Sequence, residues 1–176
     1  MLKLFFNLLI FFFNKNLYNF FKCFFFKKGF LHVLTNYNFY FNLLFFLKKS
    51  TFFQLKMLVD TVVIDFPNKF NRFLITYLLL SLNLNFRLNV SFCFNELFPL
   101  LTIKDLYSNS NWLEREIWDF YGIFFLFNND LRRIFLDYGF EGYPLRKDFP
   151  LYGYFELFYN QSSKSLFYTN VQIMKD

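Results

Sequence analysis

Residues 87–94 read RLNVSFCF, and this short stretch carries the clearest structural pattern in the chain. Large apolar side chains alternate along it with polar or small ones. The apolar positions are Leu88, Val90, Phe92 and Phe94, and the positions between them are Asn89, Ser91 and Cys93. A period of two residues is typical of a β-strand, because successive side chains point to opposite faces. The alternation therefore predicts an antiparallel strand with one buried face and one exposed face.

Two further strands are predicted on the N-terminal side of this stretch. Residues 72–83 are largely apolar, and the sequence NLN at 83–85 suits a tight connection to residues 85–94, which together predict a β-hairpin. Residues 58–66 read LVDTVVIDF, and their β-branched content favours a strand that stops before Pro67. These three strands predict a mostly antiparallel sheet.

Helices are expected on either side of the strands. Residues 41–57 suit a helix that exposes Lys48 and Lys49, and residues 95–107 are predicted to form another helix. Residues 152–159 suit a last strand of the sheet. The predicted fold class is therefore α+β, an α/β sandwich: a mostly antiparallel sheet packed with helices, followed by an irregular C-terminal loop and tail.

The N-terminal part of the chain differs in composition from the rest. Residues 1–50 are expected to form a hydrophobic, Lys-rich extension, followed by one domain at 51–160 and a tail at 161–176. Leu4–Phe13 is nearly continuous apolar sequence, but a helix that spans a bilayer needs about 20 residues. The extension contains no arginine, whereas a mitochondrial import presequence is rich in arginine and serine. We therefore expect a hydrophobic helix packed on the body or on a partner, with neither a transmembrane span nor a cleaved presequence.

A third region with a clear sequence pattern follows, and a helix is predicted at its start, over residues 111–122. Asn111 is placed to cap the first N–H groups, and Glu114 follows at the spacing of a capping box. Arg115 and Asp119 have the i, i+4 spacing of an ion pair on one helix face, and Gly122 suits the residue that ends the helix. An apolar stripe at helical spacing is made of Leu113, Ile117, Phe120 and Tyr121.

Residues 112–150 hold both tryptophans, four of the six arginines and three of the five glycines. Asp130 suits the start of a second short helix at 131–136. Glycine and proline then exclude regular structure, so residues 137–150 are expected to form an ordered, irregular loop. The charged side chains expected to project from it are those of Glu141, Arg146, Lys147 and Asp148.

Charged and aromatic residues alternate in this stretch, and two interpretations of them remain open. Arginine makes bidentate pairs with carboxylates, and arginine with aromatic residues is typical of binding hot spots, which favours an interface. The same residues can equally form an intramolecular network that fixes the loop to its own helix. The candidate residues, called the signature residues below, are Glu114, Arg115, Glu116, Asp119, Gly122, Asp130, Arg132, Arg133, Asp137, Tyr138, Gly139, Phe140, Glu141, Gly142, Pro144, Arg146, Lys147, Asp148, Phe149 and Pro150.

Composition excludes several classes of function. The sequence has two cysteines, Cys23 and Cys93, and one histidine, His32. An iron–sulfur cluster or a structural zinc site needs about four ligands, so this chain alone cannot supply one, and both cysteines are expected to be unpaired core residues. No GxGxxG, Walker, nucleophile-elbow or HExxH motif occurs. We therefore expect no catalytic, cofactor-binding or metal-binding residue, and a structural role for His32.

Charge and composition give information about partners and origin. Residues 1–60 hold eight lysines and one acidic residue, whereas residues 61–176 hold eleven basic and twelve acidic residues. The basic segment favours RNA or a membrane surface as a partner, but the near-neutral body does not. The chain has 34 phenylalanines and no alanine. Codons for Phe, Asn, Lys and Tyr begin with A or T at both first positions, so this composition predicts an AT-biased genome such as that of an organelle.

The residues of this stretch and their order resemble those of a known family. The run ERE-IWD-FYG, then DLRRI, then DYGFEGYPLRKDFPLYGY resembles the signature of the thirty-kilodalton subunit of respiratory complex I, the proton-pumping NADH:ubiquinone oxidoreductase. LVD, IDFP and NRF in the predicted sheet are similar to the same family, so the resemblance covers about residues 55–160. The family usually has His or Lys six residues after the glycine that corresponds to Gly122, and this chain has Asn128 at that position.

The resemblance implies a function. It implies a cofactor-free, non-catalytic structural and assembly subunit that supports the quinone-reducing module in the peripheral arm, on the matrix side of the mitochondrial inner membrane. Flavin, iron–sulfur clusters and ubiquinone are expected on partner subunits, chiefly the large quinone-site subunit and its iron–sulfur neighbours in a hetero-oligomer without nucleic acid. The resemblance also favours the interface interpretation of the signature residues. The alternative is an RNA-binding organellar protein, for example a ribosomal one, that uses the basic N-terminus.

Overall fold

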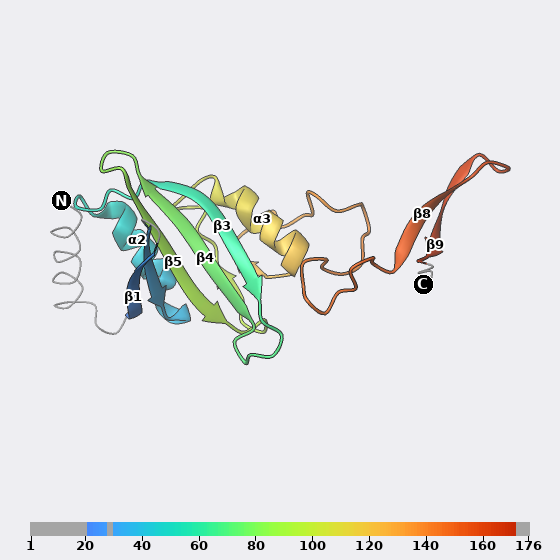
Figure 1. The fold of residues 1–176 in the computed structure, drawn as a ribbon. Coiled ribbons are helices and arrows are strands. Elements are labelled where there is room, and N and C mark those ends of the chain that lie inside the picture. The colour runs from blue at the N-terminus through green and yellow to red at the C-terminus, as the bar shows by residue number, and fades with distance from the viewer. Residues whose placement is uncertain (1–20, 28–29, 172–176) are drawn as a thin grey trace.

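The computed structural model describes residues 21–27 and 30–171, so the apolar run Leu4–Phe13 lies outside the described residues. Figure 1 shows a twisted sheet with helices beside it, then an irregular segment that leads to a separate hairpin. The sheet contains β1 (Phe21–Lys27), β2 (Phe30–Thr35), β3 (Met57–Asp65), β4 (Phe73–Ser81) and β5 (Phe86–Phe94). The remaining elements are η1 (Tyr37–Phe39), α2 (Tyr40–Lys49), β6 (Leu100–Leu101), α3 (Ser110–Tyr121), β7 (Phe125–Leu126), β8 (Phe155–Asn160) and β9 (Ser165–Asn170).

The strand order of the large sheet is β1-β2-β5-β4-β3. β3, β4 and β5 form consecutive antiparallel pairs, in which Thr76 stands opposite both Val62 and Ser91. These three strands and the tight turn between β4 and β5 agree with the prediction, and the mostly antiparallel α+β fold is confirmed. β2 joins β5 in parallel and β1 pairs antiparallel with β2. Neither was predicted, because the parallel pair brings together residues 31–34 and 88–91, which no local pattern connects.

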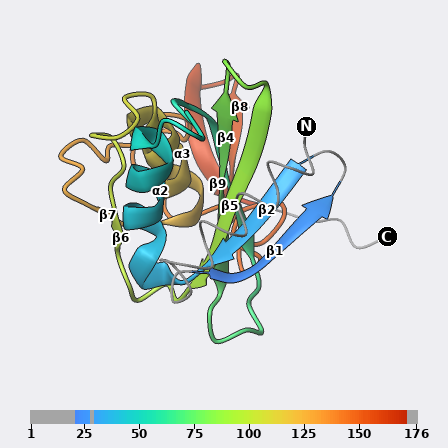
Figure 2. The ribbon, with the colours of Figure 1, turned by 90° about the vertical axis from the view of Figure 1, so that its left-hand side faces the viewer.

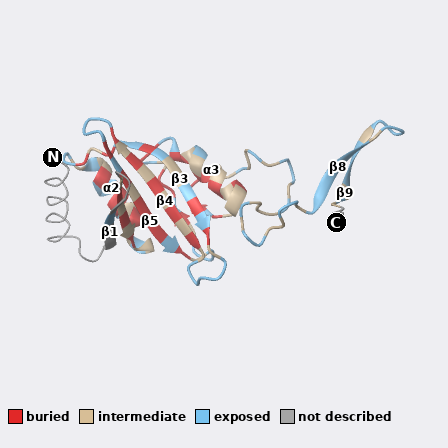
Figure 3. Ribbon diagram, in the orientation of Figure 1, coloured by how far each residue is buried: buried red, intermediate tan, exposed pale blue. Residues whose placement is uncertain are grey.

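The core lies between the sheet and its two helices. α2 and α3 both lie on the same face of the sheet (Figure 2). Burial alternates along β4, as Figure 3 shows. The buried hydrophobic residues of β4 are Phe73, Ile75, Tyr77 and Leu79, and α2 adds Tyr40, Leu43, Leu44 and Leu47. The rings of Tyr40 and Phe92 stack with centroids 4.5 Å apart, so aromatic packing joins α2 to the centre of the sheet.

β2 and α2 contribute to this same core. Leu31 and Val33 of β2 and Leu47 of α2 are fully buried within it. In the described part of the chain, the packed core therefore begins near residue 30, on the N-terminal side of the domain boundary expected at residue 50. No helix within residues 21–27 and 30–171 combines the length and the apolar character needed to cross a bilayer.

The helix predicted over residues 95–107 does not form. The segment is made of short turns, extended residues and β6, which pairs in parallel with β7. Pro99 lacks a backbone N–H, and its ring disfavours helical conformation at the residue before it. The parallel partner, 25 positions away in the register Leu100 to Phe125, supplies the backbone hydrogen bonds that a local helix would have made.

Two other elements differ from their predicted extent. The helix expected at 41–57 ends at Lys49, and Lys49 is exposed, whereas Lys48 is half-buried and donates to the Leu106 carbonyl. The strand expected at 152–159 forms as β8, but it pairs with β9 in a separate two-stranded sheet and does not join the large one.

Side chains from α3 and the residue before it occupy the edge of the sheet at β3. β3 is the last strand in the sheet order. Asn109 Nδ2 donates to the Leu58 carbonyl at 2.7 Å, and the Tyr121 hydroxyl donates to the Val63 carbonyl at 2.9 Å. Two carbonyl groups of an edge strand are therefore already hydrogen-bonded within the chain.

Tyr77 and Tyr40 give a matched test of the core. Both are at most 2% exposed, and the Tyr40 hydroxyl donates to the Leu101 carbonyl at 2.8 Å, whereas the Tyr77 hydroxyl has no hydrogen-bond partner among the described residues. Burying an unpaired polar group costs about 1–3 kcal/mol. Tyr77→Phe is therefore expected to leave the free energy of unfolding unchanged or to raise it, and Tyr40→Phe to lower it by about 1 kcal/mol. Urea unfolding of both variants checks this, and a larger loss for Tyr77→Phe would contradict it.

Candidate functional site

Helix α3 positions the first of the signature residues. It begins at Ser110, and no side-chain hydrogen bond caps its start. The capping box predicted from Asn111 and Glu114 is wrong, because both residues lie within the helix. The predicted end is confirmed: Gly122 has a left-handed backbone with φ of 70° and donates its N–H to the Trp118 carbonyl. Residues of the predicted apolar stripe that pack on the core are Leu113, Ile117 and Tyr121.

Glu114 lies inside the core and is 1% exposed. Its carboxylate accepts hydrogen bonds from Thr102 Oγ1 at 2.6 Å, the Ile103 N–H at 2.8 Å and Asn128 Nδ2 at 2.9 Å. Burial raises the pKa of Glu114, although these donors favour the ionised form. Asn128 therefore gives this carboxyl a neutral donor at the position where the resembled family usually has a cation. Glu114 connects α3 to the segment around β6.

The ion pair predicted between Arg115 and Asp119 does not form. The Arg115 guanidinium lies over the Trp112 ring, 4.8 Å from its centroid, and Nη1 is 3.7 Å from Asp130. Arg115 Nε also donates to the Arg132 carbonyl at 3.3 Å. Asp119 binds a different part of the following segment, so the two side chains hold that segment at two separate points.

Asp119 is fully buried and organises the chain that follows Arg133. Its Oδ1 accepts from Arg133 Nη1 at 2.9 Å. Its Oδ2 accepts from three successive backbone N–H groups, at 3.1, 2.8 and 3.1 Å, which are those of Ile134, Phe135 and Leu136. The short helix predicted at 131–136 is absent, because these N–H groups converge on one anion. Burial alone would raise the pKa of Asp119, but the backbone donors and Arg133 outweigh it and lower the pKa.

Tyr143 joins the irregular loop to the end of α3. Its ring lies against Gly122, where a Cβ atom would stand 2.5 Å from ring carbons. The guanidinium groups of Arg133 and Arg146 lie 5.3 and 4.8 Å from the ring centroid, and Trp118 meets the ring edge-on at 6.0 Å. The loop therefore rests on the helix through an aromatic ring that only a glycine leaves room for.

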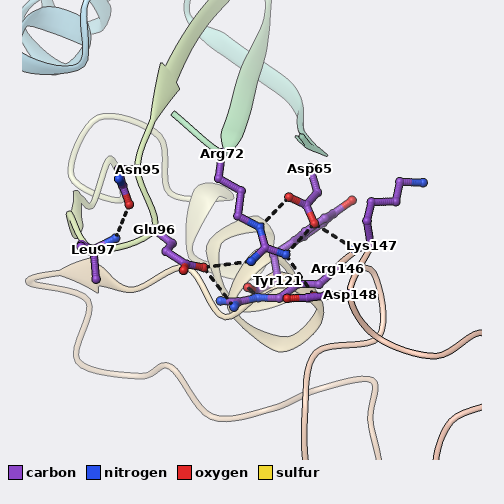
Figure 4. Close-up of polar contacts among 9 residues, drawn as sticks. All are labelled: Asp65, Arg72, Asn95, Glu96, Leu97, Tyr121, Arg146, Lys147 and Asp148. Carbon is purple, nitrogen blue, oxygen red and sulfur yellow. Dashed lines mark hydrogen bonds and ion pairs between the residues drawn. The ribbon is translucent and has the colours of Figure 1, made fainter. Parts of the chain in front are cut away.

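A second network joins the loop to the sheet (Figure 4). Arg72, just before β4, donates to both carboxylate oxygens of Asp65 at 2.7 and 2.9 Å. It also lies 3.0 Å from Asp148 and 3.2 Å from Glu96. The hydrogen bond from Arg72 is the main cause that lowers the pKa of Asp65.

The loop enters this network at two further points. The backbone N–H of Lys147 donates to Asp65 at 2.8 Å. Arg146 pairs with Glu96 at 3.3 Å, and its Nε donates to the Tyr121 carbonyl at 2.6 Å. Arg146 is therefore half-buried and does not project, contrary to the prediction. Sequence reasoning did not select Asp65 as a site residue, because nothing local connects it to a donor 82 positions later.

The structure divides the signature residues by exposure. The buried or half-buried residues with polar or aromatic partners include Glu114, Arg115, Asp119, Gly122, Arg133 and Arg146. The exposed ones are Arg132, Asp137, Tyr138, Gly139, Glu141, Lys147 and Asp148. The remaining signature residues are also half-buried, and they are Glu116, Asp130, Phe140, Gly142, Pro144, Phe149 and Pro150. The intramolecular network uses the first group together with Asp148 of the second group, whose carboxylate lies 3.0 Å from Arg72. The other side chains of the second group face outward, and that of Arg132 is 75% exposed.

The cysteine and histidine positions bear on metal chemistry. Cys93 is unpaired but exposed on the outer face of β5, so its predicted core position is wrong; the Cys23 side chain lies outside the described part. His32 stacks on Phe25 with ring centroids 4.8 Å apart. Within the described ranges, no group of three or more His, Cys, Asp or Glu side chains is placed to hold a metal ion.

Comparison with known proteins gives one consistent answer. The family described as "Respiratory-chain NADH dehydrogenase, 30 Kd subunit" matches residues 35–155. The NADH-ubiquinone oxidoreductase subunit 9 of Acanthamoeba castellanii is 43% identical over 139 residues, which are 79% of this chain and 70% of that protein. The NADH dehydrogenase [ubiquinone] iron-sulfur protein 3 of Beta vulgaris is 43% identical over 130 residues, covering 74% of this chain and 68% of that protein.

A solved structure shares the fold. A chain in the structure of the membrane-bound sulfane sulfur reductase, an archaeal respiratory membrane complex, superposes with a TM-score of 0.69 at 22% identity. The superposition covers 82% of this chain and 85% of the other. At this identity the likeness concerns the fold alone.

The contact between Gly122 and Tyr143 predicts unequal effects of the same substitution at two glycines. Gly122→Ala is expected to lower the free energy of unfolding by about 2–5 kcal/mol, because left-handed backbone costs a residue with a Cβ about 1–2 kcal/mol and a crowded Cβ adds about 1–3 kcal/mol. Gly139 has φ of 77°, and no atom lies within 4 Å of the position that a Cβ would take. Gly139→Ala is therefore expected to lower the free energy of unfolding only by the cost of the left-handed backbone, about 1–2 kcal/mol. Equal losses in denaturant unfolding would show that the Tyr143 contact does not constrain the site.

The buried Asp119 carboxylate predicts a stability that depends on pH. Asp119→Asn is expected to lower the free energy of unfolding at pH 7 by about 3 kcal/mol, because charge-assisted hydrogen bonds contribute about 1.5–3 kcal/mol each. The folded pKa is lowered, so this stabilisation is complete above the unfolded pKa of about 3.9 and is lost as the pH falls through the folded pKa. The wild type should therefore lose stability more steeply than Asp119→Asn below about pH 4.

Asp130 supplies the control for this measurement. Its side chain is 45% exposed and pairs with Arg132 at 3.1 Å. Asp130→Asn is expected to lower the free energy of unfolding at pH 7 by less than about 1 kcal/mol. Chemical unfolding of the three proteins between pH 2 and pH 7 makes the comparison, and parallel curves for Asp119→Asn and the wild type would exclude the proposed anchoring by Asp119.

Proposed function

Because this chain belongs to the family of the 30-kilodalton subunit of the respiratory-chain NADH dehydrogenase, complex I, we propose that it is a structural and assembly subunit of that enzyme. It lies in the quinone-reducing part of the peripheral arm, on the matrix side of the mitochondrial inner membrane. Its chief neighbours are the large quinone-site subunit and nearby iron–sulfur subunits. The AT-biased composition supports synthesis of the chain inside the organelle.

The observation that most directly supports a scaffold role is that several charged signature residues bind groups of their own chain. Asp119, Arg133 and Arg146 all bind groups of their own chain. These contacts fix a loop that has almost no regular backbone hydrogen bonding of its own. A loop held in this way presents its outward side chains in one conformation, which lowers the entropy lost when a partner binds. The outward residues Arg132 and Lys147 then contact the partner.

The chain takes part in electron transfer only by holding other subunits in place. Two cysteines and one histidine in the whole sequence cannot complete a four-ligand iron–sulfur site, and the chemistry of such a cluster requires that number. Iron–sulfur clusters are therefore assigned to the partner subunits, and the proposal places flavin and ubiquinone there as well. The contribution of this chain to catalysis is the relative position of those subunits.

Isolation of the tagged chain from mitochondria in mild detergent tests the proposal. We expect complex I subunits to co-purify, together with NADH–quinone oxidoreductase activity, and the separately folded chain to show no cluster signal by electron paramagnetic resonance. Recovery of ribosomal components in place of complex I subunits would contradict the proposal. It would favour the alternative of RNA binding by the basic N-terminus, whose affinity should fall steeply with salt.

Arg132 provides a specific test of the outward surface. Arg132→Ala is expected to reduce assembly of the complex at least tenfold. It should not change the melting temperature of the separate chain, because the Arg132 side chain is 75% exposed and its ion pair among the described residues is with half-exposed Asp130. The control is Arg87→Ala, an exposed arginine on β5 outside the signature. Native gel electrophoresis quantifies the assembled complex. Equal assembly of the two variants would exclude Arg132 from the interface.

A further inference from the structure

In the described part of the chain, the α-helices cover one face of the large sheet. They are α2 and α3, which lie on the same side of it (Figure 2). The opposite face, called the outer face below, is formed by the strand residues that alternate with the core residues. On β3 and β4 its apolar members are Met57, Val62, Ile64, Leu74, Leu78 and Leu80. The sheet therefore carries a second apolar surface on the side away from these helices.

The composition of the outer face favours a particular kind of occupant. Met57, Val62 and Ile64 are 42–44% exposed, although the solvent side of an antiparallel sheet is usually polar. The charged residues at the outward positions of β3, β4 and β5 are Asp60 and Arg87, which have opposite signs and lie on the two flanking strands. An occupant that fits this face is therefore apolar and carries little charge.

The size of the outer face matches one helix. β3, β4 and β5 have nine residues each, which at about 3.3 Å per residue gives a length of about 30 Å. The axes of β3 and β5 lie about 10 Å apart, because neighbouring strands are separated by about 4.8 Å. A helix with its side chains is about 10–12 Å across, so one helix along β4 covers the width of all three strands.

The segment that precedes β1 has the chemistry of such an occupant. Residues 1–20 lie outside the described residues, and within them Leu4–Phe13 is nearly continuous apolar sequence. At helical spacing, the polar residues in and beside this run form one narrow stripe, and they are Lys3, Asn7 and Asn14. The side opposite the stripe is apolar and carries Phe5, Leu9 and Phe12. A helix with so wide an apolar side needs a surface that covers it.

The course of β1 determines where this segment enters the sheet. β1 starts at Phe21, which stands opposite Thr35. Leu34, next to Thr35, is paired with Ser91 of β5, so β1 starts at the end of the sheet where β5 ends. This end carries Cys93 on the outer face.

The connection between the segment and β1 is long enough for the segment to reach β4. Three strand spacings, about 14 Å, separate β1 from β4, and the seven residues 14–20 extend to about 23 Å. A short connection also gives an effective concentration in the millimolar range. A contact within the chain is therefore favoured over the same contact with a separate protein.

We propose that Leu4–Phe13 forms a helix that packs along β4 on the outer face of the sheet, with Phe5, Leu9 and Phe12 against the apolar residues of β3 and β4. The sheet is then covered by helices on both faces. This inference goes beyond the proposed function, because the contact lies within the chain and needs no partner subunit.

Cys93 provides a native probe for this contact, because its thiol is exposed on the outer face. In the full chain within mitochondria, Cys23→Ser leaves Cys93 as the one native thiol, and a second cysteine is introduced at one of two adjacent positions. Phe12→Cys places it on the sheet side of the helix, and Phe11→Cys places it toward the polar stripe. A short bis-maleimide is expected to join position 12 to Cys93 at least fivefold more than position 11, as quantified by peptide mass spectrometry.

Ile64 and Leu82 supply a matched pair of charge substitutions in the sheet. Ile64→Lys places a charge on the outer face, and Leu82→Lys places it in the turn after β4, where Leu82 is 72% exposed. In the chain with Phe12→Cys, the first substitution is expected to lower the crosslink yield at least fivefold and the second less than twofold. Equal yields for the two would contradict packing on the outer face.

The same experiments distinguish the other possible positions of the segment. Equal crosslinking from positions 11 and 12 would overturn the inference, because the helix would then have no fixed side on the sheet. A crosslink from position 12 to another polypeptide in place of Cys93 would overturn it in favour of a partner subunit. Retention of the chain in membranes after alkaline extraction, lost when residues 4–13 are deleted, would overturn it in favour of membrane insertion. These readouts do not use co-purification with complex I subunits, so they leave the proposed function untouched.

Discussion

The irregular segments of this chain depend on carboxylates that the regular elements supply. Asp65 at the end of β3 binds the N–H of Lys147, Glu114 of α3 binds the N–H of Ile103, and Asp119 of α3 binds three successive N–H groups. Loops lack the periodic partners that satisfy main-chain groups in helices and strands. A buried carboxylate is in turn costly unless donors surround it. The acid and the loop that it binds therefore stabilise each other.

The same dependence explains which parts of the structure the sequence predicts. β3, β4 and β5 follow from side-chain alternation and β-branched content, which are local properties, and Gly122 follows from the conformation that a helix end requires. Glu114 has the spacing of a capping residue, yet tertiary contacts with Ile103 and Asn128 place it in the core. The absent helices at 95–107 and 131–136 share this cause. In both segments, partners distant in sequence take the N–H groups that a local helix would use.

The abundance of phenylalanine makes position a better guide than residue type. Phe73, Phe92 and Phe125 are fully buried, whereas Phe70 is 84% exposed in a turn. Mutational bias toward Phe codons places such residues wherever the fold tolerates them, and single exposed apolar residues need no functional explanation. In the β8–β9 hairpin, exposed aromatic residues lie on both faces of the ribbon: Phe155, Tyr159 and Tyr168 on one, and Phe158 and Phe167 on the other. The family resemblance, rather than composition, connected the signature residues to a respiratory enzyme, and the geometry then separated those facing inward from those facing outward.

The hydrogen bonds that Asn109 and Tyr121 make to the last strand of the sheet have a consequence for the chain before it meets its partners. An open strand edge is a template on which further strands add, and a chain this rich in phenylalanine is prone to such growth. With the carbonyls of Leu58 and Val63 already occupied, an incoming strand cannot complete its ladder at β3. Side chains of α3 and of the residue before it thus occupy part of the edge at which fibrous self-association would begin.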